Sequence, residues 1–509
     1  MKSTPLSLIA GTVALAAVTG FAALNAPGGT GAPEAKAASR LPVERSSLLC
    51  PAPSTSELAD TTYTSFTPAA KGGGESGTAK LNPSVPLPAD GAEDAGKDDK
   101  DDKKEKAGQD PGKPVVTLDR AGEPATAATS ASDAPALIGT ATGRLAPGWT
   151  AQQTTMTPAG DARGLLGLSC TAPDTDFWFP GASTSKNRQD YIHLTNPDDT
   201  AAVADIEMYG PEGTLESDAA EGVTVPARSS VSLLVPTLTT EAVEDVTLHV
   251  TTRTGRIGAV VRAADRTVGS DWLAASDDPA GTLVLPGIPA DATSVRLVAY
   301  APGEDDADVK VQLLGRTATF APAGNATLHI KSGMTASVDL KNVTRGEPGT
   351  LRLSPEGGGA TPIVAALRVV RGTGAGQEVA YIPATGPVGA RASVAGNRAK
   401  GTVLSLTAPG ATAEVKVTAS AGSEAGESTV KTYTVKGGTT LEVVPEAPAG
   451  LKGVYALTVE PESGGPVHAA RTLTVAEGGI DMFTVQTLPD DGGTVEVPAA
   501  EQDLSVLDD

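Results

Sequence analysis

The sequence predicts an all-β protein of tandem immunoglobulin-like β-sandwich repeats, each about 105 residues long, behind an N-terminal apolar helix. Three observations support this: many turn residues, short stretches of alternating apolar and polar residues, and markers that recur at nearly constant spacing. The 509 residues include 58 glycines and 39 prolines, which suit many short strands and disfavour long helices. Because aromatic residues make up only 3% of the chain, the cores must be packed mainly from Val, Leu, Ile and Ala.

Four sequence markers recur along the chain. They are an edge-like strand after a turn, a closing strand rich in valine and alanine, a short strand ending in proline, and a hairpin proline followed by an alternating strand. Successive copies of all four markers lie about 105 residues apart, with one shorter spacing between Pro286 and Pro383. The markers fall at Val225, Ile330 and Val435; at Ile257, Ile363 and Val467; at Pro180, Pro286 and Pro383; and at Pro197, Pro302 and Pro409 with strands from Val203, Val309 and Val415.

Within one repeat the strands alternate. In 190–195, Tyr191, His193 and Thr195 share one face, whereas Ile192 and Leu194 share the other. Period two indicates half-buried strands, and about seven of them per repeat favour an immunoglobulin-like sandwich. The alternative is a propeller-like ring of repeats, although seven strands are too many for one blade.

These markers divide the chain into domains. An earlier, divergent copy is indicated because 50–56 resembles 179–185, and because the strand 115–119 matches the one near Val203. The long gap before 115 predicts an insert, 71–113, which is Gly-rich and then charged and is expected to be disordered. The predicted domains are a divergent repeat at 47–173, repeats at 174–279, 280–376 and 377–478, and a terminal strand and tail at 479–509.

The N-terminus indicates membrane targeting. Lys2 precedes an apolar stretch over 6–24, and no acidic residue occurs before Glu34. Such a segment predicts a signal-anchor or signal peptide at 1–26, followed by a linker at 27–46. The expected location is the cell membrane with an extracytoplasmic bulk, or secretion.

The chain has two cysteines, Cys50 and Cys170. In an oxidising compartment they predict one disulfide, which would join the first and last strands of the divergent repeat.

The residues that could carry chemistry form no recognisable site. The net charge of −22 disfavours a nucleic-acid role, because phosphate binding needs clustered Lys and Arg, and we expect no nucleic-acid partner. The four histidines stand alone, the tetrad 183–186 (S-x-x-K) lacks its partner motifs, and the glycines of 372–376 precede a strand rather than a helix. We therefore expect no catalytic residues, no metal and no cofactor. The candidate contact surface is aromatic: Phe177, Trp178 and Phe179 with Tyr191.

Several motifs together resemble an uncharacterised family of actinobacterial, membrane-anchored extracytoplasmic proteins, a domain of unknown function. The likeness lies in the N-terminal apolar segment, Cys50-Pro51, Cys170 with 177–181, Leu194–Pro197 and the Val-Pro-Ala-Arg-Ser segment from Val225. The resemblance implies export and a β-rich ectodomain, and it implies no activity.

Three functions are compatible with these features. The first is a non-enzymatic cell-envelope ectodomain, a scaffold or a module that binds an envelope protein or wall polymer. The second is an accessory subunit of a membrane enzyme of envelope polysaccharide synthesis, and the third is an envelope hydrolase.

Overall fold

The computed structural model describes residues 39–69, 76–85, 113–217 and 219–497. These residues form strands, turns and three short 3-10 helices, η1 (Gly143–Leu145), η2 (Val235–Thr237) and η3 (Gly374–Gly376), with no α-helix among them. The prediction of an all-β protein is confirmed. The apolar segment 1–26 and the tail beyond 497 lie outside the described residues, and within the described part no helix is long and apolar enough to cross a membrane.

The chain forms two compact units. The described part of the terminal unit is a ribbon in which β1 (Ser39–Pro42) pairs antiparallel with β38 (Thr494–Val497). β1 therefore falls inside the predicted linker. The second unit, Val43–Gly493, contains all other strands, and Val43 N donates a hydrogen bond to Gly493 O across its two ends (3.1 Å).

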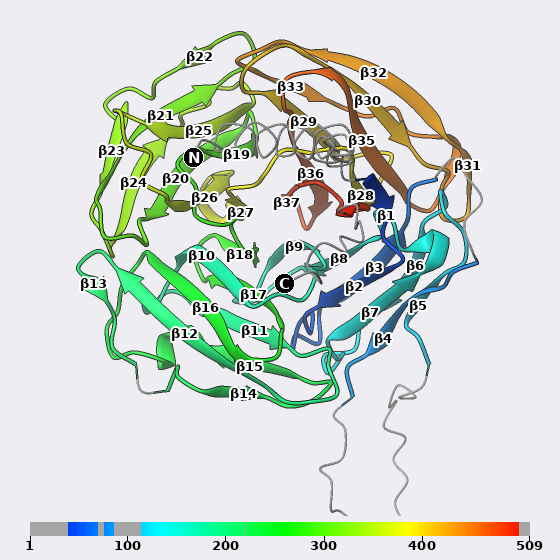
Figure 1. The fold of residues 1–509 in the computed structure, drawn as a ribbon, viewed down its shortest axis with the longest axis horizontal. Helices are drawn as coiled ribbons and strands as arrows, with labels where there is room; N and C mark the ends of the chain where they lie inside the picture. Colours follow the sequence, from blue (N-terminus) through cyan, green and yellow to red (C-terminus); the bar gives the residue numbers. More distant parts are fainter. Residues whose placement is uncertain (1–38, 70–75, 86–112, 218, 498–509) are drawn as a thin grey trace, which may run out of the picture. The chain divides into compact units, whose positions relative to one another are not determined.

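The second unit consists of four sandwich repeats (Figure 1). The strands of the first are β2 (Arg45–Cys50), β3 (Asp60–Phe66), β4 (Ala79–Pro83), β5 (Val116–Leu118), β6 (Ala125–Thr129), β7 (Leu137–Thr142), β8 (Thr150–Thr157) and β9 (Gly164–Ser169). Those of the second are β10 (Asp176–Ala182), β11 (Tyr191–Thr195), β12 (Ala202–Gly210), β13 (Gly213–Thr214), β14 (Val223–Val225), β15 (Ser230–Leu234), β16 (Val246–Thr254), β17 (Gly258–Asp265) and β18 (Gly269–Leu273).

The third repeat comprises β19 (Leu283–Ile288), β20 (Ala292–Tyr300), β21 (Ala307–Leu314), β22 (Thr319–Phe320), β23 (Thr327–Ile330), β24 (Thr335–Lys341), β25 (Gly349–Pro355), β26 (Val364–Arg371) and β27 (Glu378–Pro383). The fourth comprises β28 (Ala392–Asn397), β29 (Thr402–Ala408), β30 (Ala413–Ala419), β31 (Ala425–Glu427), β32 (Thr429–Val435), β33 (Thr439–Val443), β34 (Ala449–Lys452), β35 (Tyr455–Gly464), β36 (His468–Glu477) and β37 (Ile480–Thr487).

All four repeats share one connectivity. The first repeat shows it in the orders β2-β7-β4-β5 and β6-β3-β8-β9, and equivalent strands follow the same order in the others. The two sheets of a repeat pack on a shared core, as an immunoglobulin-like sandwich does. Relative to constant-type immunoglobulin domains, the first and seventh strands have exchanged sheets, and the fourth strand pairs with the third instead of the fifth.

The last strands of the repeats meet around a common centre (Figure 1). β9 contacts β18, β18 contacts β27, β27 contacts β37, and β37 contacts β9. Apolar side chains fill each junction, for example Leu166 with Trp272 between the first and second repeats and Leu165 with Met482 between the fourth and first. The four sandwiches thus form a closed cycle of contacts. The structure therefore combines the immunoglobulin-like sandwich repeat with the ring of repeats that the sequence offered as the alternative.

The structure corrects two predicted boundaries. Residues 379–383, placed at the start of the fourth repeat, form β27, which pairs with β26 and so ends the third. Within the predicted insert 71–113, β4 is an ordered strand that pairs with β5 and β7, because Ala79 and Leu81 bury their side chains in the core. Residues 71–75 and 86–112 of the insert lie outside the described part.

Candidate functional site

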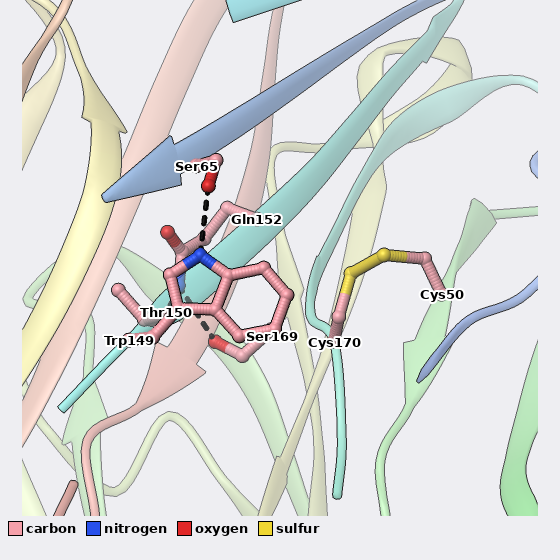
Figure 2. The surroundings of a disulfide bond; sticks show 7 residues. All are labelled: Cys50, Ser65, Trp149, Thr150, Gln152, Ser169 and Cys170. Atoms are coloured by element: carbon pink, nitrogen blue, oxygen red, sulfur yellow. Dashed lines mark hydrogen bonds between the residues drawn. A yellow bond between two sulfur atoms is a disulfide. The ribbon is translucent and has the colours of Figure 1, made fainter. Parts of the chain in front are cut away.

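The predicted disulfide is present. Cys50, at the end of β2, is bonded to Cys170, which follows β9 (Figure 2). Backbone hydrogen bonds between Leu49 and Thr171 run alongside it. Nearby, Trp149 Nε1 donates to Ser65 Oγ (2.8 Å). The disulfide therefore joins the first and last strands of the first repeat at the position that the sequence indicated.

The predicted aromatic contact surface is wrong. Phe177 and Phe179 point into the core of the second repeat. Trp178 is 7% exposed and packs against Tyr300 and Val364 of the third repeat. The three aromatics on β10 are buried from both sides because the neighbouring repeat covers the outer face of this strand. Only Tyr191 stays partly exposed, with the guanidinium of Arg262 over its ring at 5.0 Å.

The histidines occupy structural positions. His193 and His468 are buried, and burial lowers their pKa values to about 3 and about 4, so both are neutral. His249 stacks on Trp178, and His329 lies at the surface beside Asp308. Among the described residues, no group of three or more His, Cys, Asp or Glu side chains could hold a metal ion.

The S-x-x-K tetrad does not form a nucleophile. The Ser183 hydroxyl is fully buried and donates to Val243 O (3.0 Å). An acylating serine needs an exposed hydroxyl activated by a neighbouring base. This hydroxyl instead secures the loop between β10 and β11.

A buried acidic cluster lies where the four repeats meet. Asp271 of β18 accepts hydrogen bonds from the backbone N–H groups of Gly167 of β9 (3.0 Å) and Trp272 (2.8 Å). Thr484 of β37 contacts Gly167, and Glu378 of β27 completes the cluster from the third repeat.

Burial dominates the protonation of this cluster. It raises the pKa of Asp271 well above its usual range, although the two backbone N–H groups oppose the shift. It also raises the pKa of Glu378 to about 7, against the effect of Arg163, whose Nε lies 2.9 Å from Oε1. Because both carboxyl groups belong to residues that are only 1% exposed, a substrate cannot reach them. Their role is to join repeats.

An accessible groove of about 220 Å³ opens between the first and fourth repeats. The packing of Phe66 on Ala395 and Ala456 joins the two repeats beside it. A hydrogen bond from Ala395 N to Gln152 Oε1 (2.7 Å) joins them further. The lining residues are Phe66, Pro68, Ala69, Ala121, Gly122 and Glu123 of the first repeat, and Arg391, Thr418, Ser420, Ala421, Ser428, Thr458 and Glu460 of the fourth.

The charged groups of the groove already have partners. Glu460 pairs with Lys416 across β35 and β30 (2.8 Å), and Arg391 pairs with Asp491 (2.5 Å). Glu123 lies 3.6 Å from Arg120. The hydroxyls of Ser420 and Thr458 are also engaged within the fourth repeat. What the groove offers a ligand is therefore mainly the hydroxyl groups of Thr418 and Ser428 and small apolar side chains, framed by paired charges.

The groove could not be located from the sequence. Thr418 belongs to the outward-facing set of an alternating strand, a pattern that reveals its direction but not the neighbouring repeat. Its opposite wall, at Ala121–Glu123, comes from a different repeat and faces it only because the cycle closes.

The fold defines a class: a cyclic array of four immunoglobulin-like sandwiches with a junctional groove. A family model described as "Family of unknown function (DUF5719)" matches residues 125–446, and the chain belongs to this family. No curated protein and no solved structure matches the chain.

Proposed function

We propose that this chain is a non-enzymatic ectodomain of the bacterial cell envelope, whose groove between the first and fourth repeats binds a wall polysaccharide. The observation that carries the proposal is the lining of the groove. Hydroxyl side chains both donate and accept hydrogen bonds, as sugar hydroxyls do, and small apolar residues accommodate the faces of a sugar ring.

Several features support an extracytoplasmic location. The sequence has an apolar N-terminal segment, and the disulfide suits an oxidising compartment. The net charge of −22 favours solubility and disfavours nucleic acid. We propose that residues 1–26 anchor the protein in the membrane with the repeats outside, and that it comes from an actinobacterium.

Binding is favoured over hydrolysis by the surroundings of the groove carboxylates. Glycosidases need one carboxyl group that remains protonated and a second that is ionised. Glu123 and Glu460 belong to different repeats, but each lies beside a cationic side chain. Both carboxylates therefore lie in ion pairs at the surface rather than in the apolar pocket that surrounds the general acid of a glycosidase.

The test is a co-sedimentation assay of the purified full chain with isolated cell-wall polysaccharide. The double substitution Thr418→Val and Ser428→Ala removes two groove hydroxyls, and Thr434→Val, on the exposed face of β32, is the matched control. We expect wild type and control to bind and the double variant to bind several-fold less.

Other results would point elsewhere. Equal sedimentation of all three proteins, or of none, would remove the groove from the proposal. Isolation of a single membrane enzyme by crosslinking in intact cells would instead favour an accessory subunit, and release of soluble sugars in the assay would favour a hydrolase.

A further inference from the structure

A second opening lies within the second repeat and shares no lining residue with the groove. It has a volume of about 310 Å³. Its walls are the loop 184–189 between β10 and β11, residues 234–242 between β15 and β16, and Arg266 after β17. The S-x-x-K tetrad, which has no catalytic geometry, therefore contributes to the wall of a pocket.

Arg188 lies in this pocket with part of its guanidinium free. The residue is only 5% exposed, and its Nε and Nη2 donate to the two carboxylate oxygens of Asp190 (2.9 and 2.7 Å). Asp190 also accepts from Ser183 N, and the Tyr381 ring lies 5.7 Å from the guanidinium carbon, so the arginine is rigidly placed. Nη2 also donates to Gly181 O (3.4 Å), whereas Nη1 makes no hydrogen bond to any described residue.

The rim of the pocket carries further charges. Lys186 is exposed and forms no ion pair within the described part of the chain, whereas Arg266 pairs with Asp161 (3.2 Å). Glu241 is the acidic residue of the lining. Asp190 pairs with Arg188 and Asp161 pairs with Arg266. Among the described residues this leaves Lys186 as the cation of the lining without an ion pair, so the pocket suits a ligand group with one negative charge rather than two.

We propose that this pocket binds a singly charged oxyanion, a carboxylate or a phosphodiester, through the free Nη1 group of Arg188 and the ammonium group of Lys186. A guanidinium N–H makes a charge-assisted hydrogen bond to an oxygen of such a group, and a nearby ammonium adds charge without demanding geometry. Both oxyanions occur as repeating groups of acidic polymers. The site is independent of the proposed polysaccharide groove and can be tested separately.

The experiment is calorimetric titration of the purified full chain with dimethyl phosphate and, separately, with acetate, both at constant ionic strength. Lys186→Gln removes the rim charge, and Lys436→Gln makes the same change at an exposed lysine of the fourth repeat. We expect one-to-one saturable binding of at least one probe. Lys186→Gln should weaken it about fivefold, as expected for loss of a partly exposed charge-assisted contact, and Lys436→Gln should leave it unchanged.

The two probes distinguish the ligand source. Tighter binding of dimethyl phosphate assigns the pocket to a phosphodiester polymer, and tighter binding of acetate assigns it to a uronic acid or another carboxylate. If neither probe saturates, or if both substitutions weaken binding equally, the pocket is not an oxyanion site.

Discussion

Replacing Glu378 with glutamine should remove a pH dependence of stability that originates at the centre of the four repeats. Burial raises the pKa of Glu378 from its ordinary 4.5 to about 7, in spite of Arg163. Between these two pH values the unfolded chain has released the proton and the folded chain still holds it. The folded state therefore binds more protons, so the free energy of unfolding falls as pH rises.

The size of the effect follows from the shift. The rise in the pKa of Glu378 from 4.5 to about 7 corresponds to about 3 kcal/mol of stability. This contribution to the free energy of unfolding is fully present below about pH 4.5 and is lost above pH 7. Glutamine is uncharged throughout, so Glu378→Gln should lack this decline. The neighbouring Asp271 also has a raised pKa, but it is present in both proteins, and its own contribution largely cancels in the difference between them.

The assay is urea unfolding of wild type and variant from pH 4.5 to 8.5, followed by fluorescence of the buried tryptophans. The variant should gain about 3 kcal/mol relative to wild type between the two ends of this range. Glu460→Gln, at an ion-paired surface glutamate, is the control and should change little. Parallel pH curves for wild type and Glu378→Gln would refute the assignment of a raised pKa to this carboxyl group.

Two further perturbations test how the unit is held together. Cys50→Ser or Cys170→Ser should lower the free energy of unfolding by about 5 kcal/mol in the chain-entropy treatment, and dithiothreitol should do the same to wild type alone. Equal midpoints in urea before and after reduction would contradict this. Gly167→Ala should lower the free energy of unfolding by about 1–3 kcal/mol, because a Cβ there would lie 2.5 Å from Thr484 Cγ2. Gly410→Ala is the control, since a Cβ at that position meets no neighbour. Equal melting temperatures of the two variants would show that the junction can relax.

The repeat and its period could be predicted because buried positions repeat faithfully. Ile257, Ile363 and Val467 begin the seventh strands or lie just before them, and all are almost completely buried. Val225, Ile330 and Val435 are likewise buried equivalents, although they end a strand rather than begin one. At these six positions the side chain faces the core of its own repeat, so the local sequence pattern is sufficient to predict the repeat.

The predicted boundary between the third and fourth repeats is wrong because proline is not the residue that defines the first strand of a repeat. The defining residue is the one that follows it. In β10, β19 and β28 the pairing register shifts at a bulge that contains Gly181, Gly287 and Gly396. Their φ angles of 100°, 93° and 74° are ones that favour glycine. Pro383 has no such glycine after it and ends β27. A glycine with a positive φ angle, rather than the proline, therefore marks the first strand of a repeat.

The burial of the aromatic residues on β10 and the position of the groove could not be predicted from the sequence, and the reason is the same for both. Whether Trp178 is exposed depends on the third repeat, and whether Thr418 faces a groove depends on the first, since both positions are outward-facing in their own sandwich. Trp178 acquires its surroundings when the second and third repeats pack together, and the groove forms only when β37 meets β9 and the cycle closes. A repeat excised alone would therefore expose Trp178 and lose the groove. This makes the closed cycle, and not the single sandwich, the smallest unit in which the proposed binding function can exist.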